Sequence, residues 1–216
     1  MKWIKLLVGI LLLPFCAGAA PALLDTIRAT GRAETIWVAF LAGFACWLVI
    51  HVLLPRPMRL YVFGHELTHA LWTWLFAGKV ERFKVSANGG HVVTNRSNFL
   101  VTLAPYFFPV YAFLVVAVFG LGNLLAGWSQ YLAVFHLLLG AAYAFHVTMT
   151  IHALSTHQTD ITSQGYLFSA VVVWLGNLLL LLIGIPLLTG KVGVLASLGG
   201  WLDHTALVLR RLGQAI

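Results

Sequence analysis

Charged residues are scarce in this 216-residue chain: they make up 9% of it, against 61% hydrophobic residues, and only six residues are acidic. A soluble globular domain carries roughly a quarter charged residues. The composition therefore excludes an ordinary water-soluble fold. We expect one membrane domain over residues 1–216, because no Ser/Pro-rich linker, repeat or low-complexity tail divides the chain.

Cysteine is nearly absent as well. Cys16 and Cys46 both lie in apolar segments, without CxxC or Cys/His spacing, which excludes a disulfide framework and a cysteine metal site. The net charge of +7 comes from short basic groups beside apolar runs. A nucleic-acid-binding protein usually has a stripe of basic residues interleaved with aromatic residues, and these basic groups do not form one. We therefore expect the lipid bilayer, and not nucleic acid, as the partner.

Long apolar runs are what the chain does have, and they predict an all-α, multi-pass membrane protein with about six to seven membrane helices. Residues 1–24 have a basic start, an apolar stretch and then small residues. They are either a cleavable signal peptide or the first retained span, and we favour retention. Further spans are expected at about 36–54, 99–121, 129–154, 164–189 and 192–209.

A shorter, moderately apolar helix is expected at 57–77, and its first half contains His65-Glu66-Leu67-Thr68-His69. Arg56 and Arg59 lie at its start, and four basic residues follow between 79 and 96. Lys and Arg concentrate on the cytoplasmic side of membrane proteins. With both ends basic, the helix is predicted to be re-entrant, entering the membrane from the cytoplasm without crossing it.

A polar stretch follows this helix and predicts a small β-hairpin. Residues 80–85 and 91–94 are β-prone, and Asn88-Gly89-Gly90 between them has turn chemistry.

The two histidines of the short helix are spaced i, i+4, so both imidazoles lie on one helical face and can bind one Zn²⁺ ion. In sites of this kind the glutamate next to the first histidine accepts a proton from the attacking water, and Glu66 stands at that position. Histidines that merely bond their neighbours are the alternative. A carboxylate without a partner in a membrane-embedded helix is costly, however, and this favours the metal.

A catalytic zinc ion usually has a third protein ligand and one open position. Asp160 is the acidic residue that stands in a polar break between two apolar helices, on the same predicted side as His65. An N-cap for the next helix is its alternative role. His146, His152 and His157, near the end of the preceding span, compete as third ligand, as hydrogen-bond partners of a ligand, or as oxyanion donors.

These features together resemble the site-2 protease group of intramembrane zinc metalloproteases, and within it the small bacterial branch. The likeness covers roughly residues 60–170: the HExxH helix at 65–69, the hairpin with Gly89-Gly90, the segment Leu103-Ala104-Pro105, and an aspartate before Gly165. The usual Asn-Pro and Asp-Gly residues around the last ligand are absent, with Thr159-Asp160-Ile161 in their place. The oxyanion donor is therefore unassigned.

The resemblance implies a catalytic core at 57–170, with His65, His69 and Asp160 as zinc ligands, Glu66 as general base, and the hairpin guiding an unwound substrate strand by edge pairing. We expect an endopeptidase that cleaves membrane-embedded protein or peptide substrates, in a bacterial inner membrane with its active site toward the cytoplasm.

Two other functions compete with this expectation. One is a zinc-binding membrane sensor or chaperone without protease activity, and the other is a transporter whose intramembrane His and Asp residues carry ions. Glu66 beside an open metal position favours the enzyme. The sequence lacks paired, interrupted helices in two matching halves, which speaks against the transporter.

Overall fold

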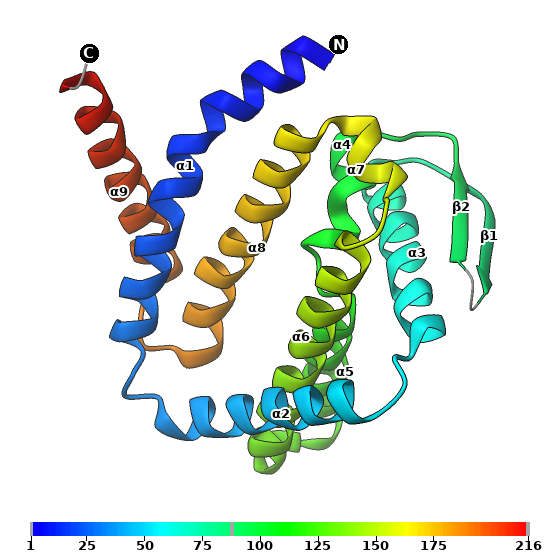
Figure 1. The fold of residues 1–216 in the computed structure, drawn as a ribbon. Helices are drawn as coiled ribbons and strands as arrows, with labels where there is room; N and C mark the ends of the chain where they lie inside the picture. The colour runs from blue at the N-terminus through cyan, green and yellow to red at the C-terminus, as the bar shows by residue number, and fades with distance from the viewer. Residues whose placement is uncertain (1, 87–88, 215–216) are drawn as a thin grey trace. The chain divides into compact units, whose positions relative to one another are not determined.

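The computed structural model describes residues 2–86 and 89–214, and helices make up most of this part of the chain (Figure 1). The chain forms two compact units. Unit 1 comprises Met1–Glu34 and Thr159–Ile216, and unit 2 comprises Thr35–Gln158.

Unit 1 is built on the first helix of the chain. Its elements are α1 (Lys2–Ala29), α7 (Thr159–Gln164), α8 (Tyr166–Thr189) and α9 (Val194–Gln214). Helix α1 packs against both α8 and α9, and Trp201 of α9 donates its indole N–H to the main-chain oxygen of Phe15, at 2.9 Å. The small residues Gly18 and Ala19, which resemble a cleavage site in the sequence, are buried in the middle of this continuous helix.

Unit 2 contains the HExxH helix and the hairpin. Its elements are α2 (Glu34–Leu53), α3 (Met58–Leu75), β1 (Val80–Ser86), β2 (Gly89–Thr94), α4 (Phe99–Leu103), η1 (Ala104–Tyr106), α5 (Val110–Ala126), η2 (Trp128–Tyr131) and α6 (Leu132–Leu154). Helices α3 and α6 share a core of Tyr61, Val62, Phe145, Met149 and Ala153. Helix α3 also contacts both strands and η1, so it joins the hairpin to the helical core of unit 2.

Helix α2 crosses α6 at two glycines (Figure 1). A Cβ atom on Gly43 would lie 1.8 Å from the main-chain oxygen of Leu137, and one on Gly140 would lie 1.9 Å from that of Phe40. The two backbones are therefore in direct contact, which no larger residue at either position would allow.

The predicted hairpin is present as an antiparallel pair of strands, with Lys84 opposite His91 and Val85 opposite Gly90. Gly89 and Gly90, expected in the turn, are the first residues of strand β2. Asn88, the other predicted turn residue, lies outside the described residues. Val85 packs on the core beneath α3, and the Phe83 ring lies 5.9 Å from that of Phe63 on α3. One face of the hairpin therefore covers this helix.

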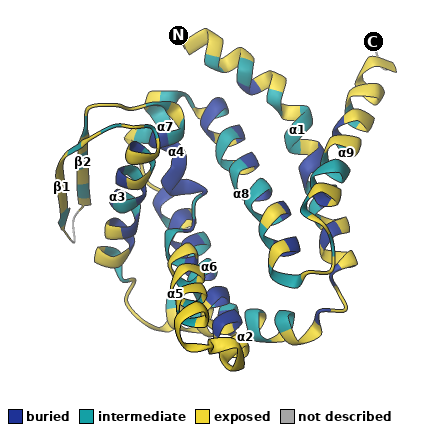
Figure 2. Ribbon diagram, turned by 180° about the vertical axis from the view of Figure 1, so that it is seen from behind, coloured by how far each residue is buried: buried dark blue, intermediate teal, exposed yellow. Residues whose placement is uncertain are grey.

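Several described helices are long and apolar enough to cross a membrane, which is compatible with the predicted multi-pass protein. Four qualify, namely Lys2–Ala29, Glu34–Leu53, Trp128–Leu154 and Tyr166–Thr189, or five if a bent pair forms one span. Exposed residues lie along most of the helices (Figure 2). On α5 they include Leu124, with an exposed fraction of 80%, and Leu125, with 76%. Apolar surface of this kind suits a hydrocarbon environment.

Two of the predicted spans differ from the structure. The expected span at 99–121 is bent by 81° between Phe99–Tyr106 and Val110–Ala126, because Pro109 lies at the break and cannot donate the hydrogen bond that would continue the helix. Helix α9, expected to cross at 192–209, is helical but does not qualify as a span. It carries Asp203, His204, Arg210 and Arg211. The expected count of six to seven membrane helices is therefore not confirmed by the described residues.

Candidate metal centre

Helix α3 carries His65, Glu66 and His69 together. The ring centroids of the two histidines lie 4.9 Å apart, because residues four apart are neighbours on a helix surface. The predicted convergence of the imidazoles is therefore present in the structure.

His69 is oriented by a contact outside its own helix. Its Nδ1 donates a hydrogen bond to the main-chain oxygen of Val101 in α4, at 2.8 Å. This bond leaves Nε2 as the nitrogen that can bind a metal ion, an arrangement usual for metal-binding histidines.

His65 is held between two tyrosines. Its ring centroid lies 5.8 Å from that of Tyr61, one turn earlier on α3, and 5.3 Å from that of Tyr106, which meets it edge-on at 86°. Tyr106 is completely buried. Aromatic packing on both sides restricts the directions that the imidazole can take.

Asp160 is the second residue of α7 and follows Gln158, the last residue of unit 2, by two positions. His65, His69 and Asp160 form a group that could hold a metal ion. Two imidazole nitrogens and one carboxylate oxygen are also a donor set found in catalytic zinc sites, so the residues present fit zinc.

Glu66 is buried, with an exposed fraction of 7%, and strand β2 lies against it. A Cβ atom on Gly90 would come within 2.7 Å of Glu66 Cγ and within 2.8 Å of Val62 Cγ1 on the same helix. The strand approaches the Glu66 side chain this closely because residue 90 has no side chain.

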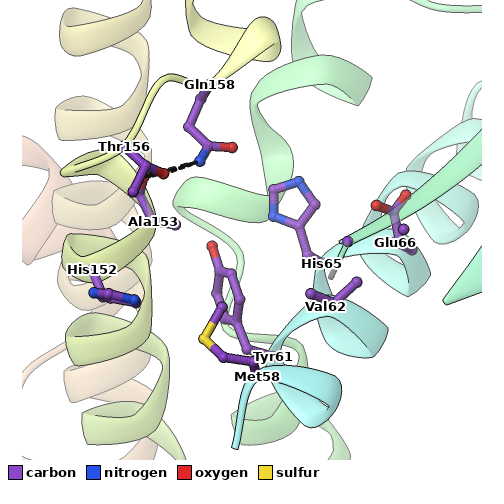
Figure 3. A pocket seen from close by; sticks show the side chains of 11 residues that line it. Met58, Tyr61, Val62, His65, Glu66, His152, Ala153, Thr156 and Gln158 are labelled. Carbon is purple, nitrogen blue, oxygen red and sulfur yellow. Dashed lines mark hydrogen bonds between the residues drawn. The ribbon is translucent and has the colours of Figure 1, made fainter. Parts of the chain in front are cut away.

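A cavity of about 310 Å³ opens beside these residues, between α3, strand β2 and the end of α6. His65 and Glu66 line it on α3, and His152, Thr156 and Gln158 line it on the opposite wall. Figure 3 shows the Tyr61 hydroxyl pointing toward the space between these walls, while Glu66 lies on the other side of His65. The cavity is large enough for a side chain and a stretch of peptide backbone.

The other three predicted histidines lie in different places. His152 lines the cavity. His146 is buried behind His65, where both line a second cavity of about 20 Å³. His157 is exposed in the turn after α6. None of the three belongs to the group formed by His65, His69 and Asp160.

Tyr61, Tyr106 and Gln158 are not among the site residues predicted from the sequence. Tyr61 was detectable, since it precedes His65 by four residues and therefore shares its helical face. Tyr106 and Gln158 gave no local signal, because their hydrogen bond joins residues 52 positions apart.

Comparison of this chain with models of protein families, with curated proteins and with solved structures finds no match.

Proposed function

We propose that this chain is a zinc-dependent intramembrane endopeptidase. The observation that carries the proposal is the position of Glu66, a buried carboxylate next in sequence to a ligand of the His65–His69–Asp160 group and beside an open cavity. A site built only to hold a metal ion would not need an acid in that position.

In this proposal His65, His69 and Asp160 hold the zinc ion. When bound, zinc acts as a Lewis acid on a substrate carbonyl and lowers the pKa of water, so that a nucleophile is available near neutral pH. Glu66 accepts the proton of the attacking water as general base, and then returns it to the nitrogen of the cleaved peptide bond.

In this proposal the hairpin binds the substrate. Strand β2 lies against Glu66 through Gly90, and the described sheet has two strands, so each strand has an outer edge. An extended peptide that pairs with the β2 edge would pass close to the carboxylate. A transmembrane helix has its amides bonded internally and must unwind before it pairs in this way. We therefore propose membrane-protein substrates that are cleaved near a helix end, on the cytoplasmic side of a bacterial inner membrane.

The test combines zinc content with peptide hydrolysis in the purified, reconstituted chain. Wild type is expected to bind one zinc ion and to cleave a membrane-anchored reporter. Glu66→Gln should keep the zinc and lose activity by on the order of 10²- to 10⁴-fold. His65→Ala, His69→Ala and Asp160→Ala should bind zinc much more weakly than wild type and lose activity.

Glu81→Gln is the matched control. Glu81 is an exposed acid of strand β1, and its neutralisation should leave both measurements unchanged. Hydrolysis that survives Glu66→Gln contradicts the proposed mechanism. One zinc ion per chain without hydrolysis of any membrane-anchored reporter would indicate a non-proteolytic sensor or chaperone instead.

A further inference from the structure

Gln158 closes the turn that follows α6. Its side-chain amide donates to the main-chain oxygen of Ala153, at 3.0 Å, and to the hydroxyl of Thr156, at 2.8 Å. Its side-chain oxygen accepts a hydrogen bond from the Tyr106 hydroxyl, at 3.3 Å. The carboxamide thus uses both of its amide hydrogens and its oxygen. Figure 3 shows its bond to Thr156.

Tyr106 connects this turn to the first zinc ligand of the proposed site. Its ring packs edge-on against His65, and its hydroxyl reaches Gln158. It lies in η1, next to Pro105, and is completely buried. A buried aromatic side chain has little freedom to move, so it can fix the distance between the two groups that it contacts.

Asp160 follows Gln158 by two residues, and two trans peptide units span at most about 7.6 Å between Cα atoms. A fixed Gln158 therefore limits how far the backbone of Asp160 can lie from the turn. Zinc–oxygen bonds in proteins are about 2.0 to 2.2 Å long, so a shift of one ångström at the turn would displace this ligand.

We propose that Tyr106 and Gln158 are positioning residues that place Asp160 for zinc binding. The inference rests on the zinc site proposed above. It adds two residues outside the HExxH helix that position one of the zinc ligands. Tyr106 acts on the metal through Asp160, which it reaches by way of Gln158.

The test is a double-mutant cycle on zinc affinity, measured by competition with a chromophoric chelator on the purified full chain in detergent. Tyr106→Phe removes the hydroxyl and keeps the ring against His65. It should weaken zinc binding by about 10- to 100-fold, the usual effect of losing a group that orients a ligand. In the Asp160→Ala background the same change should alter the affinity by less than about twofold, because the ligand that it positions is gone.

Tyr111→Phe is the matched control. The Tyr111 hydroxyl donates to the main-chain oxygen of Leu60 on α3, at 2.6 Å, and has no link to the turn at Gln158. Any effect of its loss comes from a loosened α3, so it should be equal with and without Asp160. Gln158→Met removes the same hydrogen bond together with those to Ala153 and Thr156. It should weaken zinc binding at least as much as Tyr106→Phe, and it replaces that variant if the tyrosine variant does not fold.

The outcomes separate this inference from the proposed function. Wild-type zinc affinity in both Tyr106→Phe and Gln158→Met overturns the positioning role and leaves the peptidase standing. An equal loss in both backgrounds overturns it too, since the tyrosine would then act through α3 alone. A wild-type chain that binds no zinc overturns both proposals.

Discussion

The Nδ1 atom of His69 lies 2.8 Å from the main-chain oxygen of Val101. Val101 belongs to α4, a five-residue helix whose N-cap is Asn98, and the Asn98 side chain accepts a hydrogen bond from the Val101 N–H at 2.9 Å. A short helix without any titratable residue thus orients a candidate zinc ligand, and Asn98 holds that helix at its start.

Asn98→Ala should therefore affect both stability and zinc binding. Loss of an N-cap costs about 1 kcal/mol of the free energy of unfolding, and a less ordered Val101 carbonyl should weaken zinc binding by up to about tenfold. Thermal unfolding with and without zinc, together with zinc titration, measures the two effects. Asn98→Asp keeps the capping oxygen and is the control. The link between α4 and the metal is wrong if the alanine and aspartate variants bind zinc equally well.

Gly90→Ala should impair the proposed active site directly. The added methyl would lie 2.7 Å from Glu66 Cγ and 2.8 Å from the main-chain oxygen of Lys84, so either strand β2 or α3 must shift. We expect a loss of about 1 to 3 kcal/mol in stability and a fall in peptidase activity on the order of 10²-fold, because the general base is displaced.

Gly120→Ala serves as the control for that variant. A Cβ atom on Gly120, in α5, meets nothing within 4 Å, so the change should leave activity unaltered and stability equal or higher. Reporter cleavage and unfolding in detergent distinguish the two variants. Full activity of Gly90→Ala would show that the close approach of β2 to Glu66 is not needed.

Local patterns in the sequence predicted much of this architecture. The i, i+4 spacing placed His65 and His69 on one face, and Asp160 followed from its polar break between apolar helices. The expected helices at 36–54 and 164–189 correspond closely to α2 at Glu34–Leu53 and α8 at Tyr166–Thr189. Such features depend on residues near one another in the chain, where periodicity and turn chemistry act.

The remaining features depend on tertiary contacts. Pro109 alone did not predict the 81° bend before α5, because a proline inside an apolar run can also produce a modest kink. Gly43 and Gly140 gave no indication of a helix crossing, since glycine is common in membrane helices for several reasons. The Tyr106–Gln158 hydrogen bond joins distant segments, and only the folded arrangement of η1 and α6 brings them together.

Gly43→Ala and Gly140→Ala should both destabilise unit 2. Each added methyl would lie less than 2 Å from a backbone oxygen of the other helix, and backbone cannot rotate away as a side chain can. We expect each variant to lose about 1 to 3 kcal/mol of unfolding free energy in detergent. Gly184→Ala in α8 meets nothing within 4 Å and should not be destabilised. Wild-type stability of both crossing variants would mean that α2 and α6 do not pack through these glycines.

The buried hydroxyls of Thr26 and Ser197 lie 2.8 Å apart and join α1 to α9 within unit 1. Hydrogen bonds between helices in membrane proteins contribute about 0.6 to 2 kcal/mol. Thr26→Val and Ser197→Ala should therefore show a coupling energy of about that size when unfolding is measured for both single variants and the double variant. The Thr205 hydroxyl, also on α9, bonds instead to the main-chain oxygen of Trp201, so Thr26→Val combined with Thr205→Val should be additive. Additivity in both pairs would rule out a contribution of the Thr26–Ser197 bond to stability. Coupling in the first pair alone would identify this bond as a specific polar contact that stabilises the packing of α1 against α9.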